Sequence, residues 1–242
     1  CELTYDGITQ GTAVGNYETT VTGLSNPNYT LEGGANTKLA WEIITATGNA
    51  SVTIESWTYG EPPKQPVPSS STNGIDHVTY HYTGTTSGGV SYDSDTVPTD
   101  AGKYTVTATF AATANHEAVT ATADFTIAER SIFATWSGLY WVYGQMAEAQ
   151  VTLSGVVEGD DVSVNITGVK QTAGSHRVTA ALNGTDTANY TLKNENATLT
   201  IQPKPVIFIV KDNAVQADGS EKKATVTADD ATFTKYTVTY RQ

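Results

Sequence analysis

One pattern occurs three times in this chain, and the repetition limits the fold more than any other feature. Each copy has a Gly two residues before a Tyr or His, then an alternating run, an Asn-containing turn and a closing Ile. The residues are Gly15, Tyr17, Asn28 and Ile43 in the first copy, Gly102, Tyr104, Asn115 and Ile127 in the second, and Gly174, His176, Asn189 and Ile201 in the third. Such self-similarity indicates structural units repeated along the chain.

A second set of matches gives the length of the repeat. The stretch "WTYG" begins at Trp57, "WVYG" begins at Trp141, and a weaker copy runs from Val215, with Gly219 lying 75 residues beyond Gly144. The period is therefore about 75 to 85 residues, the size of a small β-sandwich unit rather than of one turn of a solenoid.

The second copy predicts strands at residues 51–59, 77–83, 89–92, 103–111 and 118–127. From Tyr104 to Phe110, aromatic and aliphatic residues alternate with Thr. Because strand side chains point alternately to two faces, this pattern predicts an antiparallel sheet with one buried and one solvated face. The expected fold is all-β, a linear array of small immunoglobulin-like β-sandwich domains. A β-grasp-like unit is the alternative, and it requires one packed helix.

The Gly-x-Tyr pattern predicts a corner at the start of a strand. Gly permits an unusual backbone conformation, and the Tyr buries its ring while its hydroxyl bonds to the backbone, as in immunoglobulin-like sandwiches. His176 replaces the Tyr in the third copy. The sequence leaves open whether an imidazole rebuilds that corner or the corner is lost.

Composition excludes several classes of protein. The net charge of −12 disfavours binding to nucleic acid, because a polyanion would be repelled. The single cysteine, Cys1, excludes internal disulfides and Cys-based zinc sites. A lipid-bearing Cys1 is disfavoured because a strand-like sequence begins directly after it. No apolar run is long enough for a transmembrane helix, so membrane insertion within this segment is not expected.

The stretches "WTYGEPPKQP" and "PTDAGKYTVTATF" resemble bacterial surface MBG repeats, and "WVYGQ" with "TAGSHRVTAALNGTDTANYTL" resembles the related YDG repeats. The resemblance implies a complete MBG-like unit at 48–128 and a complete YDG-like unit at 129–202. Residues 1–47 then match the closing half of a unit, and residues 203–242 the opening half of another. The halves are expected to be completed by each other, by a neighbouring molecule in head-to-tail self-association, or to be partly disordered.

Two aromatic residues are candidate ligand-binding residues. Trp141 and Tyr143 align with residues of the preceding repeat and are expected to be structural, whereas Trp136 and Tyr140 have no counterpart. Exposed rings stack on sugars, so Trp136 and Tyr140 are the candidates for binding a glycan. Filling of a small core is the competing interpretation.

Glu158, Asp160 and Asp161 are weak calcium candidates, because calcium takes about six to eight oxygen ligands. The chain has no calcium-loop motif, so a solvated acidic loop is the favoured interpretation and no metal site is assigned. No nucleophile elbow or phosphate-binding loop occurs, so we expect no catalytic residues, no enzyme activity and no cofactor.

These features and the resemblance predict a non-catalytic, extracellular segment of a bacterial cell-surface protein that serves as the stalk or spacer of an adhesin-like protein. A binding module for host glycan, mucin or matrix protein is one alternative. An accessory domain of a secreted polysaccharide-degrading enzyme is the other.

Overall fold

A computed structural model describes residues 2–31, 37–211, 214, 216–222, 225–233, 237 and 239. Cys1 lies outside the described residues. The chain forms two compact units. The first comprises Cys1–Ile132, Val157–Asp161 and Gly184–Thr191, and the second comprises Phe133–Val156, Val162–Asn183 and Leu192–Gln242.

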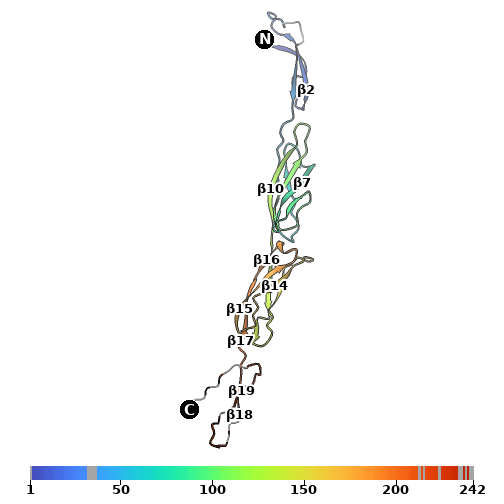
Figure 1. The fold of residues 1–242 in the computed structure, drawn as a ribbon. Coiled ribbons are helices and arrows are strands. Elements are labelled where there is room, and N and C mark those ends of the chain that lie inside the picture. The colour runs from blue at the N-terminus through green and yellow to red at the C-terminus, as the bar shows by residue number, and fades with distance from the viewer. Residues whose placement is uncertain are drawn as a thin grey trace. The chain divides into compact units, whose positions relative to one another are not determined.

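The strands up to residue 128 form three sheets (Figure 1). Their orders are β1-β2-β3, β5-β10-β9-β7-β8 and β4-β6. The strands are β1 (Leu3–Gly7), β2 (Gly15–Leu24), β3 (Thr37–Ile43), β4 (Ser51–Thr53), β5 (Trp57–Thr58), β6 (Val67–Ser69), β7 (Val78–Thr86), β8 (Ser91–Ser94), β9 (Gly102–Phe110) and β10 (Val119–Ala128).

The later strands form three further sheets, with the orders β12-β17-β15-β14, β13-β11-β16 and β18-β19. The strands are β11 (Arg130–Ser137), β12 (Tyr140–Val142), β13 (Gln150–Ser154), β14 (Ser163–Thr167), β15 (Gly174–Asn183), β16 (Tyr190–Lys193), β17 (Asn196–Gln202), β18 (Phe208–Lys211) and β19 (Thr225–Ala228). A short 3-10 turn spans Thr187–Asn189. No described helix has the length and apolarity needed to cross a membrane.

The expected all-β class is confirmed: the described residues contain strands and one 3-10 turn but no α-helix. One expected strand, at residues 51–59, is divided. β4 pairs with β6, whereas β5 pairs in parallel with β10, so the chain changes sheets between them. The stretch resembles one strand because Ile54 continues the apolar alternation from Val52, although the alternation changes phase at Trp57. The short strand β6 was not expected.

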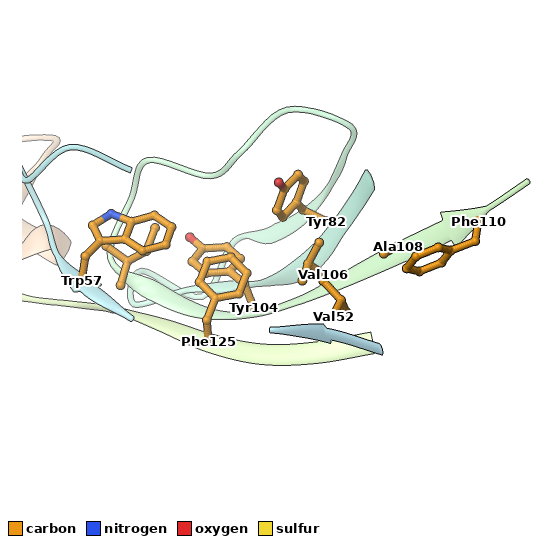
Figure 2. Close-up of a cluster of buried hydrophobic side chains, with 9 residues drawn as sticks. Val52, Trp57, Tyr82, Tyr104, Val106, Ala108, Phe110 and Phe125 are labelled. Atoms are coloured by element: carbon orange, nitrogen blue, oxygen red, sulfur yellow. The ribbon is translucent and has the colours of Figure 1, made fainter. Parts of the chain in front are cut away.

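The core of the second repeat consists mainly of aromatic rings and aliphatic side chains from β4, β5, β7, β9 and β10 (Figure 2). Phe125 stacks on Trp57 and on Tyr104, with ring centroids 5.2 and 5.6 Å apart. Along β9, Tyr104, Val106, Ala108 and Phe110 are buried. The alternation in the sequence therefore predicted the buried face of β9 correctly.

The three copies of the sequence pattern have the same strand register. We call β2, β9 and β15 the corner strands, and the Tyr or His two residues after their first Gly the corner residue. In each copy this Gly pairs with the closing Ile, and the corner residue pairs with a large apolar residue. The pairs are Gly15–Ile43 and Tyr17–Trp41, Gly102–Ile127 and Tyr104–Phe125, and Gly174–Ile201 and His176–Leu199. The sequence repeat is thus a repeated antiparallel pair of strands.

The corner contact is present in all three copies. The hydroxyl of Tyr17 donates to the carbonyl of Ala13 at 2.5 Å, and that of Tyr104 donates to Asp100 at 2.8 Å. In the third copy, Nε2–H of His176 donates to the carbonyl of Thr172 at 2.7 Å. The expected tyrosine corner is confirmed, and the imidazole rebuilds it in the third repeat.

The geometry explains why Gly lies two residues before the corner residue. Side chains at positions i and i+2 of a strand share a face, so the corner ring extends back over the Gly. A Cβ on Gly102 would lie 2.9 Å from the Tyr104 hydroxyl and 2.5 Å from the carbonyl oxygen of Thr85. A larger residue at this position would block the path of the ring to its acceptor.

We expect Tyr104→Phe to lower the free energy of unfolding by about 1 kcal/mol, because it removes one hydrogen bond and leaves the carbonyl of Asp100 without that donor. Chemical denaturation measures the change. Tyr140→Phe is the matched control, since the side chain of Tyr140 is 79% exposed. Equal stability of the two variants would show that the corner bond does not stabilise the repeat.

Candidate functional site

The Asn of the second repeat contacts the corner region of the first repeat. The side-chain oxygen of Asn115 accepts a hydrogen bond from the backbone N–H of Val14 at 3.2 Å, directly before the corner Gly of the first repeat. The backbone carbonyl of Asn115 accepts from the N–H of Ala46 at 2.9 Å. The N–H of Glu117 in turn donates to the carbonyl of Ala46 at 2.9 Å. The turn is therefore bound to both the corner loop and the connector that follows β3.

The equivalent contact occurs once more, again within the first compact unit. The side-chain oxygen of Asn189 accepts a hydrogen bond from the N–H of Ala101 at 2.8 Å, directly before the corner residue Gly102. Its Nδ2 donates to Oδ1 of Asp100 at 3.2 Å. The Asn189 side chain is buried, being only 5% exposed. In both cases, the turn Asn of one repeat is hydrogen bonded to the corner loop of the repeat before it.

A hydroxyl–carboxylate pair accompanies each Asn. The pair joins the residue two positions after the closing Ile to the residue two positions after the turn Asn. Thr45 donates to Glu117 at 3.2 Å, and Thr191 donates to Glu129 at 2.7 Å. The two residue types are exchanged between the repeats, while the hydrogen bond is kept. We call the turn Asn and this pair the junction contact.

The sequence predicted the Asn turns but not their partners. The residues of the junction contact occupy fixed offsets from the closing Ile and the turn Asn, and one member of each pair is Thr while the other is Glu. This exchange at matching positions is the signal that could have identified the pair. Separation along the chain concealed it, because Thr45 and Glu117 are 72 positions apart.

Asp160 binds two tyrosines in the first compact unit. Its Oδ2 accepts hydrogen bonds from the hydroxyl of Tyr59, at 2.8 Å, and from that of Tyr190. The N–H of Val157 donates to the Tyr190 hydroxyl at 3.0 Å. The two rings are in edge-to-face contact, with centroids 5.4 Å apart. This carboxylate therefore joins the "WTYG" stretch to the residue after Asn189.

The tyrosines beside Asp160 resist ionisation. Burial, followed by the hydrogen bond to Asp160, raises the pKa of Tyr190 to about 12 and also raises the pKa of Tyr59. An ionised tyrosine at either position would place a second negative charge against the Asp160 carboxylate. Both hydroxyls thus remain donors at neutral pH.

The three calcium candidates differ in their hydrogen-bond partners and in their exposure. Asp160 binds the two tyrosines, while Asp161 accepts from the N–H of Thr185 at 3.1 Å and donates its own N–H to Asp186 at 2.8 Å. Glu158 is exposed. Among the residues that the structure describes, no three His, Cys, Asp or Glu side chains are grouped so as to hold a metal ion.

His81, on β7, lies between the carboxylates of Asp93 on β8 and of Asp95 directly after β8. Its Nδ1 is 2.6 Å from Oδ1 of Asp95, and its Nε2 is 2.9 Å from Oδ1 of Asp93. Hydrogen bonding to Asp95 raises the pKa of His81, despite the opposing effect of desolvation. The protonated ring uses both nitrogens as donors, a role that competes with metal ligation.

Trp136 and Tyr140, the candidate binding residues, are placed differently. Trp136 is half-buried against the core of the third repeat, and its Nε1–H donates to the carbonyl of Asn194 at 2.8 Å. Tyr140 is exposed at the start of β12. A surface hollow of about 690 Å³ is lined by Tyr143 and Met146, among others, but by neither candidate. Of the two, only Tyr140 offers a ring face to a ligand.

We expect Asn189→Ala to lower the free energy of unfolding by about 1 to 3 kcal/mol, because it leaves the buried N–H of Ala101 without an acceptor. Asn189→Asp keeps the acceptor but places a carboxylate beside Asp100, so it should also destabilise. Thermal and chemical denaturation measure both changes. Asn165→Ala, at an exposed position of β14, is the control. A loss no greater than that of the control would contradict the role of the Asn.

Asp160→Asn should lower the pKa of Tyr190 from about 12 part of the way toward 10.0, because burial remains while the negative charge is removed. Since the folded pKa is raised, this contribution to stability is complete below about pH 10 and is lost as the pH rises toward 12. NMR titration of ¹³C-labelled tyrosine measures the pKa. Glu158→Gln is the control, and an unchanged pKa in Asp160→Asn would contradict the assignment.

No family model, curated protein or solved structure matches the chain. The structural basis for a function is therefore the junction contact together with Asp160, Tyr59 and Tyr190, which we call the Asp160 cluster.

Proposed function

We propose that the chain is a non-catalytic, extracellular segment of a bacterial cell-surface protein, built of immunoglobulin-like repeats of the MBG and YDG type. Its role is that of a spacer, a stalk that carries the binding end of an adhesin-like protein. The repeats supply length, and the contacts between successive repeats supply mechanical continuity.

The junction contact is the observation that carries this proposal. It occurs at two successive places in the chain, with the same roles for the turn Asn and the corner loop. A protein needs such a recurring contact if each repeat must hold the next in a defined way. An isolated binding domain has no use for it.

The chemical groups that form the junction contact also support the spacer role. The turn Asn binds a backbone N–H, and every residue except Pro has this group. Successive repeats can therefore differ in side chains and still join. The Asp160 cluster adds a second contact of half-buried and buried groups that are hydrogen bonded to one another and are costly to separate.

Glycan binding is the second candidate function, favoured by the exposed ring of Tyr140. A sugar could stack on that ring, although the half-buried Trp136 offers it little additional surface. Binding to a glycan array, lost in Tyr140→Ala, would support this role. A spacer gives no glycan signal with either protein.

The spacer role predicts one narrow distance distribution between spin labels at Thr109→Cys and Glu158→Cys, both within the first compact unit, in a Cys1→Ser background. Both positions are exposed. Double electron–electron resonance measures the distribution. Asn189→Ala and Asp160→Ala should broaden it, because each removes hydrogen bonds of the connection.

A broad distribution in the otherwise unchanged protein would contradict the spacer role, because a flexible connection cannot hold a binding end at a fixed distance. Asn16→Ala serves as the matched control for the loosening variants, since Asn16 is exposed on β2 and lies outside the junction contacts.

A further inference from the structure

We propose that the turn at Asn28–Thr30 is a docking surface for a second copy of this chain, and that it binds the corner loop at Thr172–Ala173 of that copy. The copies would then associate head to tail. This inference goes beyond the spacer role and rests on the repeated junction contact, whatever the chain does on the cell surface.

Both elements of the proposed interface have equivalents elsewhere in the chain that are hydrogen bonded to each other in the junction contacts. Asn28 occupies the place of Asn115 and Asn189 in the repeat pattern, and Ala173 occupies the place of Val14 and Ala101, directly before the corner Gly. Each engaged Asn accepts a hydrogen bond from the N–H at that place. Asn28 and Ala173 are therefore the matching acceptor and donor.

The same two elements are exposed. Ala101 and Asn189 are buried where they meet, whereas Ala173 and Asn28 are both exposed. Tyr29, next to Asn28, is 66% exposed, and its equivalent Tyr190 is 5% exposed. The side chains of Asn28 and Tyr29 form no hydrogen bond to any described residue, although the backbone N–H groups of both donate to Asn26. The turn thus presents polar and aromatic groups that its equivalent at Asn189 buries.

The sheet β1-β2-β3 supplies an independent reason for a second copy. The closing strands β10 and β17 pair in parallel with β5 and β12, each of which opens with or contains the repeat's Trp. The closing strand β3 is an edge strand among the described residues. An open edge strand attracts a further strand, because its backbone groups lack partners.

In the sequence pattern, the segment that matches β5 and β12 lies in the C-terminal region. Gly219 aligns with the Gly of "WTYG" and "WVYG", so Gln216 aligns with Trp57 and Trp141. We expect Gln216 of one copy to pair with Ile43 of the next, as Trp57 pairs with Ile127. Residues 1–47 have an excess of acidic side chains and residues 203–242 a slight excess of basic ones, which favours this pairing over contact between like ends.

Thiol cross-linking tests the proposed contact in the full chain. The junction pair Glu129–Thr191 has its equivalent in Pro203 of one copy and Thr30 of the next. Two proteins are prepared in a Cys1→Ser background, one with Thr30→Cys and the other with Pro203→Cys, and are mixed with a short bismaleimide. We expect a cross-linked heterodimer, and no such product when Asn165→Cys replaces Pro203→Cys.

Sedimentation velocity over a range of concentrations provides the second measurement. The chain should associate as its concentration rises, and Asn28→Ala should raise the dissociation constant about fivefold, the effect of one hydrogen bond. Asn16→Ala is the matched control and should leave the constant unchanged. A monomer at all concentrations, cross-linking between two Thr30→Cys chains, or association unaffected by Asn28→Ala would each overturn the proposal.

Discussion

The corner bond is the interaction on which the rest of the repeat depends. A side chain at the start of the corner strand reaches back over a Gly and donates to the carbonyl four residues before it. This bond fixes where the strand begins, and the pairing of Gly102 with Ile127 then fixes the register of the whole sheet. Because a shift by one residue would turn the apolar face of β9 to solvent, the corner and the core require each other.

The corner also prepares the surface that the next repeat uses. Its loop presents the backbone N–H directly before the Gly, and a turn Asn accepts from that N–H in two successive places. The fold within a repeat and the connection between repeats thus share one structural element. A substitution that disturbs the corner should weaken both, whereas the exchange of Thr and Glu in the junction pairs shows that the flanking side chains are freer to vary.

Two neighbouring acidic residues, Asp160 and Asp161, act as structural hydrogen-bond acceptors. Asp160 gathers two tyrosine hydroxyls, and Asp161 holds the loop at Thr185. Each carboxylate accepts hydrogen bonds from donors within the protein. The oxygen ligands of a calcium ion, in contrast, converge on one point. The net charge of −12 therefore coexists with a structural role for individual carboxylates, at the half-buried Asp160 and at the exposed Asp161.

By itself, the sequence determined the all-β class, the repeat and the corner, because these depend on local spacing. Alternation along a strand identifies its buried face, and the Gly-x-Tyr spacing places a ring over a Gly. Only the tertiary structure decided that His176 restores the corner, that residues 51–59 divide between two sheets, and that Asp160 lies between Tyr59 and Tyr190. The Asp160 contact joins groups 101 and 30 residues apart along the chain. Such contacts leave no periodic signal in the sequence, because they depend on how folding positions whole strands and loops.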